Sequence, residues 1–300
     1  MENNTSLQQQ LLEAGVHFGH LRKKWNPKML PYIFAEKKGI HIIDLNKTTE
    51  SLQEVAGVLK QIARSGKKMM FVGTKKQAKE IVTECARRIN MPFATERWLG
   101  GMLTNFNTVR KSVKKMQSID KMLGDGSAES LTKKERLQLQ RDRDKMDKVL
   151  GGISQLGRVP AALFIIDIGH EHIALAEAKR LGITTFGIVD TNCDPNKVDF
   201  AIPGNDDATK SIAIITQYIT AAIAEGLAER QAAKDEDVED ASGDDNEKKA
   251  DRLQAEAEAE AARGRGGEGR GRSGPGGGGG GQRRRTPSGG GGGRRPGGPR

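Results

Sequence analysis

The segment KMMFVG, at residues 68–73, decides the fold of this chain. It is a continuous apolar run of the length that a strand buried on both faces requires. A turn follows it, and residues 76–89 then show the apolar spacing of a helix. A strand that leads directly into a helix is the unit from which parallel sheets with helices on both faces are built.

The same alternation returns later in the chain. The sequence predicts strands at 163–167 and 184–190 and helices at 170–181 and 208–224, with one short strand near Phe93. Because crossovers between parallel strands are right-handed, helices should cover both faces of the sheet. We therefore predict an α/β fold, a three-layer αβα sandwich with a parallel central sheet.

The segment before this strand predicts a helix, a hairpin and a second helix. Ser6 followed by Gln9 resembles a capping box, and an apolar stripe then leads to Gly15, where the first helix should end. Residues 32–44 contain two β-rich pieces separated by a Lys-Lys-Gly turn, which is typical of a β-hairpin. Asn46 is the candidate cap of the second helix.

A different unit interrupts the alternation between the two halves. Apolar residues recur there at spacings of three and four, and residues 101–150 include 12 basic residues. Thr132 with Glu135 gives a second capping box after a turn at 124–130. Two helices of about 18 residues would form an antiparallel coiled-coil hairpin on the order of 27 Å long. The apolar residues are Phe106, Val109, Val113, Met116, Ile119 and Met122 in the first helix, and Leu139, Met146, Val149 and Ile153 in the second.

Charge and composition divide the chain further. The net charge is +10, but residues 263–300 hold ten arginines and one acid, whereas residues 225–262 hold 14 acids and five bases. The last segment contains no residue of the set AVILMFWYC, so it has no apolar surface with which to build a core. We predict a first αβ half at 1–104, an inserted helical arm at 105–153, a second αβ half at 154–224, an acidic Ala-rich linker, partly helical or disordered, at 225–262, and a disordered Arg/Gly-rich tail at 263–300.

The sequence argues against a membrane protein and against a secreted protein. It contains no continuous apolar run of about 18 residues. Its polar N-terminus, with an acid at position 2, is unlike a secretory signal. Cys85 and Cys193 are isolated thiols, which support neither a disulfide scaffold nor a zinc site. We expect a cytoplasmic protein.

Enzyme chemistry is not expected either. Residues 73–79 read GTKKQAK, which lacks the second glycine and the Lys-Ser/Thr pair of a phosphate-binding loop. His170 and His172 are spaced too closely to face one ion from a helix, and no nucleophile–base pair is evident. We predict no cofactor and no metal site from these motifs. One question stays open, namely whether an ion binds where aspartates gather at the carboxyl edge of the sheet, the candidates being Asp190, Asp194, Asp206 and Asp207.

Nucleic acid is the partner that the charge favours. A basic body and a basic tail point to a polyanion, and residues 21–30 place a tryptophan among four bases. Basic side chains neutralise phosphates and aromatic rings stack on exposed bases, although Trp25 and Trp98 more readily anchor loops. The candidate RNA-binding residues of the body are Arg22, Lys23, Lys24, Trp25, Lys28, Lys75, Lys76, Arg97, Asn105, Arg110, Lys111 and Lys114, and those of the tail are Arg263, Arg265, Arg270, Arg272, Arg283, Arg284 and Arg285.

Seven motifs, in order over about residues 7–224, resemble the bacterial ribosomal protein S2 family of the small subunit. Any one of them is moderate evidence, but their common order is specific. They are LLEAGVHFGH (11–20), WNPKM (25–29), IHIIDLNKT (40–48), FVGTKKQA (71–78), RWLGGMLTN (97–105), the P-x-x-LFIID strand from residue 160, and VDTNCDP with FAIPGNDDA within 189–208.

The resemblance implies a structural protein, not an enzyme. It implies an αβα domain with a coiled-coil arm that binds small-subunit ribosomal RNA and neighbouring ribosomal proteins, and that helps to dock the messenger-RNA-binding ribosomal protein S1. The Arg/Gly-rich tail departs from the family, and ribosomal RNA, messenger RNA and a neighbouring protein are all candidate partners for it. Two alternatives remain, an RNA chaperone that acts through the tail and a nucleotide-binding αβ enzyme.

Overall fold

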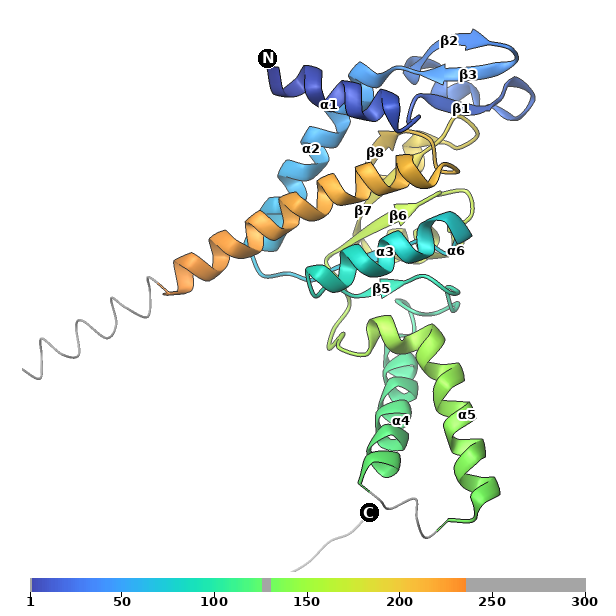
Figure 1. Cartoon of the computed structure of the whole chain (residues 1–300), viewed down its shortest axis with the longest axis vertical. Coiled ribbons are helices and arrows are strands. Elements are labelled where there is room, and N and C mark those ends of the chain that lie inside the picture. Colours follow the sequence, from blue (N-terminus) through green and yellow to red (C-terminus); the bar gives the residue numbers. More distant parts are fainter. Residues whose placement is uncertain (1, 126–130, 236–300) are drawn as a thin grey trace, which may run out of the picture. The chain divides into compact units, whose positions relative to one another are not determined.

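Five parallel strands form the centre of the fold, in the order β5–β4–β6–β7–β8 (Figure 1). The computed structural model describes residues 2–125 and 131–235, with side chains from residue 7 onward. Phe164 pairs in parallel register with Phe71 on one side and with Phe186 on the other. The predicted parallel sheet is confirmed, and β8 is an edge strand that the sequence did not predict. The strands are β4 (Met69–Val72), β5 (Phe93–Ala94), β6 (Ala162–Ile166), β7 (Thr184–Val189) and β8 (Phe200–Pro203).

Alternate side chains of each strand face opposite sides of the sheet, and helices cover both sides. In β4, Met69 and Phe71 belong to one apolar cluster, and Met70 and Val72 belong to another. The first cluster is covered by α1, α2, α3 and the C-terminal helix, and the second by α6 and the base of the arm. The predicted αβα sandwich is therefore confirmed. The helices are α1 (Glu2–Glu13), α2 (Leu45–Arg64), α3 (Lys76–Arg88), α6 (His172–Leu181) and the C-terminal helix (Thr209–Asp235).

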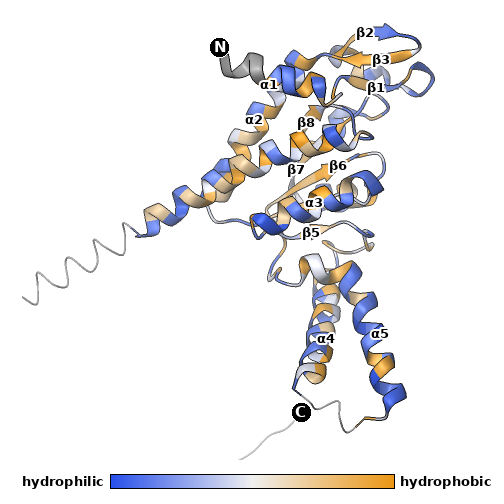
Figure 2. Ribbon diagram, in the orientation of Figure 1, coloured by the Kyte–Doolittle hydropathy of each residue, from blue (hydrophilic) through white to orange (hydrophobic). Residues whose placement is uncertain are grey.

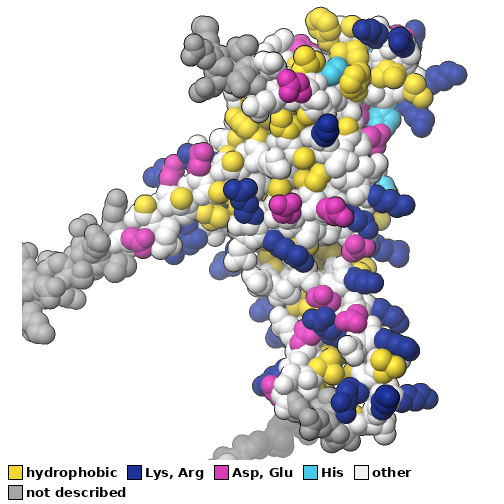
Figure 3. Space-filling view, in the orientation of Figure 1, with side chains coloured by type: hydrophobic (Ala, Val, Ile, Leu, Met, Phe, Trp, Pro, Cys, Tyr) yellow, Lys and Arg dark blue, Asp and Glu magenta, His cyan; other side chains and the backbone are white. Residues whose placement is uncertain are grey.

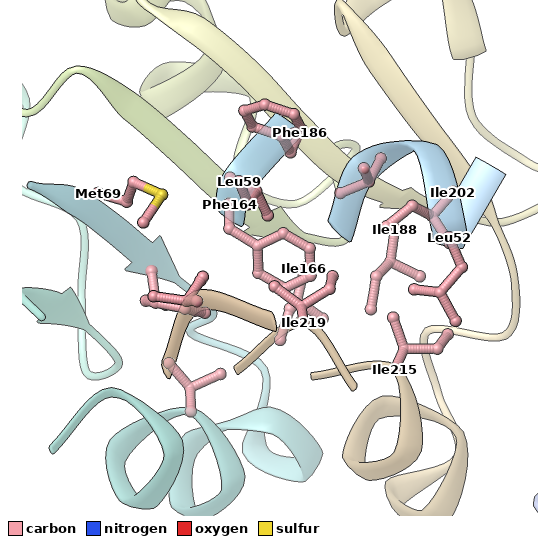
Figure 4. Packing of buried hydrophobic residues seen from close by; sticks show 14 of the residues in the cluster. Leu52, Leu59, Met69, Phe164, Ile166, Phe186, Ile188, Ile202, Ile215 and Ile219 are labelled. Atoms are coloured by element: carbon pink, nitrogen blue, oxygen red, sulfur yellow. The ribbon is translucent and has the colours of Figure 1, made fainter. Parts of the chain in front are cut away.

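The C-terminal helix contributes a row of isoleucines to the first cluster. Ile212, Ile215, Ile219 and Ile223 recur at helical spacing and are fully buried. Figure 4 shows Ile215 and Ile219 facing Phe164 and Ile188 of the sheet. In Figure 2 the strands are mainly hydrophobic, whereas the helices alternate between hydrophobic and hydrophilic faces.

In the described part of the chain, one helix, Thr209–Asp235, is long and apolar enough to cross a membrane. The sequence did not predict such a segment. This is weak evidence for a membrane span, because the core helix of a soluble protein passes the same test. The apolar row of this helix is the one that packs on the sheet, so its composition follows from burial in the core.

A second sheet of three antiparallel strands contains the predicted hairpin. The strand order is β1–β3–β2, with β1 at Phe18–Leu21, β2 at Ile33–Lys37 and β3 at Ile40–Ile43. Lys38 and Gly39 have φ angles of 55° and 75°, as a two-residue hairpin turn requires. The sequence did not predict β1, because Gly19 and His20 interrupt its apolar residues and remove the β-rich pattern.

The starts of two helices differ from the sequence predictions. Ser6 lies inside α1, so it does not cap that helix. α2 is capped by Asp44, whose side chain accepts a hydrogen bond of 3.0 Å from the backbone N–H of Asn46. The sequence analysis placed the cap at Asn46, two residues after the observed cap Asp44, because Asp and Asn are both good caps.

The C-terminal helix also extends beyond its predicted end near residue 224, since it is still helical at Asp235, the last residue that the structure describes. Lys60 of α2 explains part of this extension, because its ammonium lies 3.1 Å from Glu225 and 2.8 Å from Glu229. The first eleven residues of the predicted linker are therefore helical. The other residues of the linker, and the whole tail, lie outside the described residues.

Two contacting helices form the predicted arm, α4 (Phe106–Gly124) and α5 (Lys133–Leu150). The first helix buries Val109, Val113, Met116 and Ile119, whereas Leu150 is the buried residue of the second. The capping box of Thr132 and Glu135 is confirmed. Coiled-coil packing of the pair stays a prediction, and most of the predicted turn lies outside the described residues.

The capping box gives a first testable prediction. Thr132→Ala removes the hydroxyl that holds the N–H of Glu135, so the first turn of α5 should open more often. We expect the amides of Glu135 and Arg136, which bond to Thr132, to exchange hydrogen about fivefold faster. Ser118→Ala, an exposed change inside α4, is the control and should leave exchange in α5 unchanged. Equal exchange rates in Thr132→Ala and in the wild type would contradict the prediction.

Candidate nucleic-acid interface

Two short 3₁₀ helices after β1 carry the first group of exposed cations. They are η1 (Arg22–Lys24) and η2 (Pro27–Tyr32). Lys23 and Lys24 are exposed and form no ion pair with any residue that the structure describes. Their ammonium groups are therefore available to an external anion.

Two further cations of this segment have partners of their own. Arg22 lies 3.2 Å from a carboxylate oxygen of Glu36. The ammonium of Lys28 lies 2.6 Å from Asp194, and this hydrogen bond lowers the pKa of Asp194. The side chains of Arg22 and Glu36 are 68% and 37% exposed, so this pair is weak and can exchange for a phosphate. Lys28 is paired with a carboxylate that is only 12% exposed.

Trp25 is partly exposed beside the same cations. Its ring centroid lies 5.3 Å from that of His41, with the two planes tilted by 46°. The next residue, Asn26, donates its backbone N–H to the carbonyl of Thr191 at 2.8 Å. This geometry fits a loop anchor that still leaves part of the indole accessible, so stacking on a base stays a prediction.

Lys75 is enclosed by carboxylates rather than open to phosphate. Its ammonium lies 2.7 Å from Asp167, 2.7 Å from Asp206 and 2.8 Å from Asp207, and only 16% of its side chain is exposed. Burial alone would lower the pKa of Lys75, but the three carboxylates raise it above its ordinary value. We therefore remove Lys75 from the residues assigned to RNA, while Lys76 remains exposed at the start of α3.

The turn after β4 is filled by an acidic side chain. Glu171 accepts hydrogen bonds from the backbone N–H of Thr74 at 2.9 Å and from its hydroxyl at 2.5 Å. A strand that runs into a helix N-terminus, as here, can bind an anion through its free backbone N–H groups. A protein carboxylate already occupies the donor that such an anion would use, which argues against a nucleotide phosphate there.

Glu177 of α6 organises the loop that leads into the arm. Its buried carboxylate accepts hydrogen bonds from the Trp98 indole N–H (3.1 Å) and from the backbone N–H groups of Gly101 (2.7 Å), Leu103 (2.9 Å) and Thr104 (3.1 Å). Burial acts to raise the pKa of Glu177, but these hydrogen bonds outweigh it and the pKa is lowered. Trp98 is buried, so it anchors the loop, while Arg97 is exposed beside it.

The arm presents cations on the face opposite its buried stripe. Arg110, Lys111 and Lys114 of α4 are exposed. The first two lie between the buried positions Val109 and Val113 in the sequence, and Lys114 follows Val113. Asn105 is exposed at the position just before α4, and its side chain makes no capping hydrogen bond. Figure 3 shows Lys and Arg side chains distributed along the arm. Arg110, Lys111 and Lys114 share the exposed side of α4, and their contact with RNA stays a prediction.

A groove of about 1110 Å³ adds cations that the sequence analysis missed. It lies where β4, β5 and β6 begin, against η4 (Gly151–Ile153). Its lining includes five cations and two acids, and they come from five separate segments of the chain. No local motif could have found this groove, because only the fold brings the segments together. The charged residues are Lys67, Lys68, Arg87, Lys148 and Arg158, with Glu96 and Asp147.

The two cysteines do not offer nucleophiles. Burial, followed by nearby aspartates, raises the pKa of Cys193 to about 12, and burial also raises the pKa of Cys85. Both thiols therefore stay protonated at neutral pH. The predicted tail contacts, from Arg263 to Arg285, lie outside the described residues and stay predictions.

Comparisons with known proteins agree with these features. The family described as Ribosomal protein S2 matches residues 11–226. A protein of Cytophaga hutchinsonii called small ribosomal subunit protein uS2 is 60% identical over 244 residues, which cover 81% of this chain and 96% of that protein. The protein of the same name from Bacteroides thetaiotaomicron is 61% identical over 224 residues, covering 75% of this chain and 81% of that protein. The one from Porphyromonas gingivalis is 56% identical over 225 residues, covering 75% and 80%.

Proposed function

Because the chain belongs to the ribosomal protein S2 family, and is thus a structural, non-enzymatic component of the small ribosomal subunit, we propose that it binds small-subunit ribosomal RNA through exposed cations of the body. The observation that carries this proposal is the exposed row Arg110, Lys111 and Lys114 on α4, set opposite a buried apolar stripe. Its charge has no structural partner among the described residues, so phosphates are the natural counter-ions.

Two further surfaces support the same proposal. Lys23 and Lys24 lie beside the partly exposed Trp25, which gives phosphate contacts next to an aromatic ring. The groove near the start of β4 has a volume of about 1110 Å³ and a net positive lining, which favours phosphates. Phosphate contacts of this kind position a protein on RNA without reading its sequence.

A protein neighbour is the partner that we assign to the three-stranded sheet. Phe18 and Leu21 of β1 and Phe34 of β2 are all at least 48% exposed, as is Leu30 of η2, which precedes β2. Exposed apolar side chains of this kind favour protein contact over RNA. Ribosomal protein S1 is the partner that we propose for it, with messenger RNA as a further candidate for the tail. A cytoplasmic location follows from the ribosomal role.

The test is sedimentation of cell extract on sucrose gradients at moderate and high salt. We expect the protein to migrate with small subunits at moderate salt and to be released as salt rises, because each phosphate contact adds to the salt dependence. A variant that lacks residues 263–300 should still migrate with the subunit. If that deletion alone released the protein, the chaperone alternative that acts through the tail would replace the proposal. If the full chain stayed at the top of the gradient, RNA binding by the body would be refuted.

A further inference from the structure

The groove beside η4 carries positive charge that the described part of the chain does not neutralise. Its two acids have partners outside the lining, since Glu96 lies 2.9 Å from Lys79 and Asp147 lies 3.9 Å from Arg143. Among the described residues, four cations of the lining form no ion pair. They are Lys67, Arg87, Lys148 and Arg158.

These four cations enter the groove from separate elements. Lys67 precedes β4, and Arg87 lies in the last turn of α3. Lys148 lies in the last turn of α5, and Arg158 belongs to the loop before β6. All four are exposed, so an anion in the groove can be reached from more than one side.

The groove also offers a flat surface. The guanidinium carbon of Arg87 lies 5.7 Å from the centroid of the Phe93 ring, and both residues belong to the lining. Arg87 is exposed and Phe93 is partly exposed. Proteins that bind unpaired RNA stack its bases on aromatic rings and on guanidinium planes of this kind.

Uncharged hydrogen-bonding groups complete the lining. Asn90 and Gln155 are exposed there, and their side-chain amides form no hydrogen bond with any other residue that the structure describes. An amide can both donate to and accept from the edge of a base. A contact with phosphates alone would need only the cations, whereas a stacking surface with amides suits a base. In a duplex the bases are paired and stacked, so their faces are not accessible to such a site.

The walls of the groove are fixed by close packing. Gly152 of η4 lies directly against β5, because a Cβ at this position would collide with the carbonyl oxygen and the ring of Phe93. The ammonium of Lys68 donates to the carbonyl of Asn90 at 2.7 Å and ties the start of β4 to the end of α3. A site that is rigid before binding loses less entropy when its ligand arrives.

We propose that this groove binds an unpaired segment of RNA. One base would stack on Arg87 and Phe93, and the phosphates would lie beside Lys67, Lys148 and Arg158. The inference rests on the proposed function and adds that the RNA at this position is single-stranded. The groove volume of about 1110 Å³ slightly exceeds the roughly 300–1,000 Å³ of pockets that enclose small ligands, which gives room for more than one nucleotide.

The experiment titrates the full chain with a single-stranded oligouridine of about eight nucleotides that carries a central 4-thiouridine. After irradiation and trypsin digestion, mass spectrometry measures the crosslink to the peptide of residues 89–97, which contains Phe93 and lies between two arginines. Half-maximal yield of this crosslink reports the affinity of the groove separately from that of the Arg/Gly-rich tail. An unlabelled duplex of the same length should compete at least about tenfold less well than the unlabelled single strand.

Two variants test the stacking surface and the charge. Arg87→Lys keeps the charge but lacks the plane, so it should raise the half-maximal RNA concentration about fivefold. Arg158→Glu should raise it about tenfold, because a negative charge then faces the phosphates. Arg64→Lys, an exposed change at the end of α2 outside the lining, is the matched control for Arg87→Lys and should leave the value unchanged.

Four results would overturn the proposal. They are no crosslink to residues 89–97, equal competition by the duplex, equal competition by a nucleoside triphosphate, which would indicate a free nucleotide, and equal competition by polyglutamate, which would indicate an acidic protein segment. If circular dichroism shows that the variants do not fold, the crosslink and the competition series on the wild type decide. A protein that sediments with the small subunit but fails these tests would keep the proposed function and lose only the single-stranded assignment.

Discussion

Changing Arg110, Lys111 and Lys114 together to glutamate should lower the affinity for small-subunit ribosomal RNA on the order of 10³-fold at moderate salt. The three side chains are exposed on one side of α4, so the change removes three phosphate contacts and places three negative charges against the same phosphates. The helix itself should persist, because the buried positions Val109 and Val113 are untouched and acids near a helix N-terminus are tolerated.

The measurement is filter binding of the full chain to small-subunit ribosomal RNA at several salt concentrations. The salt slope should fall by about three in the variant, since each phosphate contact contributes close to one. A matched control changes Lys179, Arg180 and Lys197 to glutamate. These three residues are exposed and lie outside the proposed surfaces, and their replacement alters the net charge equally. If both triple variants lost affinity equally, net charge rather than the arm would carry the binding.

Glu177→Gln should destabilise the fold by about 3 kcal/mol. The carboxylate of Glu177 accepts hydrogen bonds from Trp98, Gly101, Leu103 and Thr104, and all of these are donors. A glutamine would turn one acceptor into an NH₂ group that faces those donors, leaving buried N–H groups without partners. Urea unfolding should show a lower midpoint with an unchanged slope. Glu80→Gln, an exposed change on α3, should have little effect.

The same variant has a defined pH dependence. The folded-state pKa of Glu177 is lowered, so its stabilisation is fully present above the unfolded pKa and is lost as pH falls through the folded value. The difference in unfolding free energy between wild type and Glu177→Gln should thus be constant from pH 6 to 8 and narrow below about pH 4.3. A constant difference down to acid pH would show that the charge of Glu177 is not what holds the loop.

The sequence was sufficient to predict the elements that have long apolar runs or local caps. The run at β4 and the repeated strand–helix alternation were sufficient for the parallel sheet, because burial on both faces leaves a continuous apolar signature. The box of Thr132 and Glu135 was equally clear, because all its atoms lie within four residues. By contrast, β1 reads FGHL and β8 reads FAIP, and the glycine and the proline interrupt the apolar β-rich pattern that marked the other strands.

What the sequence could not show were contacts between distant residues. Lys75 looked like a phosphate ligand until the fold brought Asp206 to it from 131 residues away. Glu177 lies in an ordinary helix pattern, and its role arises because α6 packs beside the loop before the arm. The sequence showed the residues next to Lys75 and Glu177 in the chain, but it did not show the distant residues that they contact in the fold.

The order of the strands has a consequence for how the chain is made. β4 and β6 are adjacent in the sheet, yet almost 90 residues, comprising α3, β5 and the arm, lie between them in the chain. At about 5–20 residues per second, the nascent chain must wait roughly 5–20 s after β4 emerges before its neighbour arrives. During that interval the apolar edge of β4 has no partner on that side, and the cations of α4 are synthesised while the sheet is still open. The central pair of the sheet can therefore close only after α3, β5 and the arm have all left the exit tunnel.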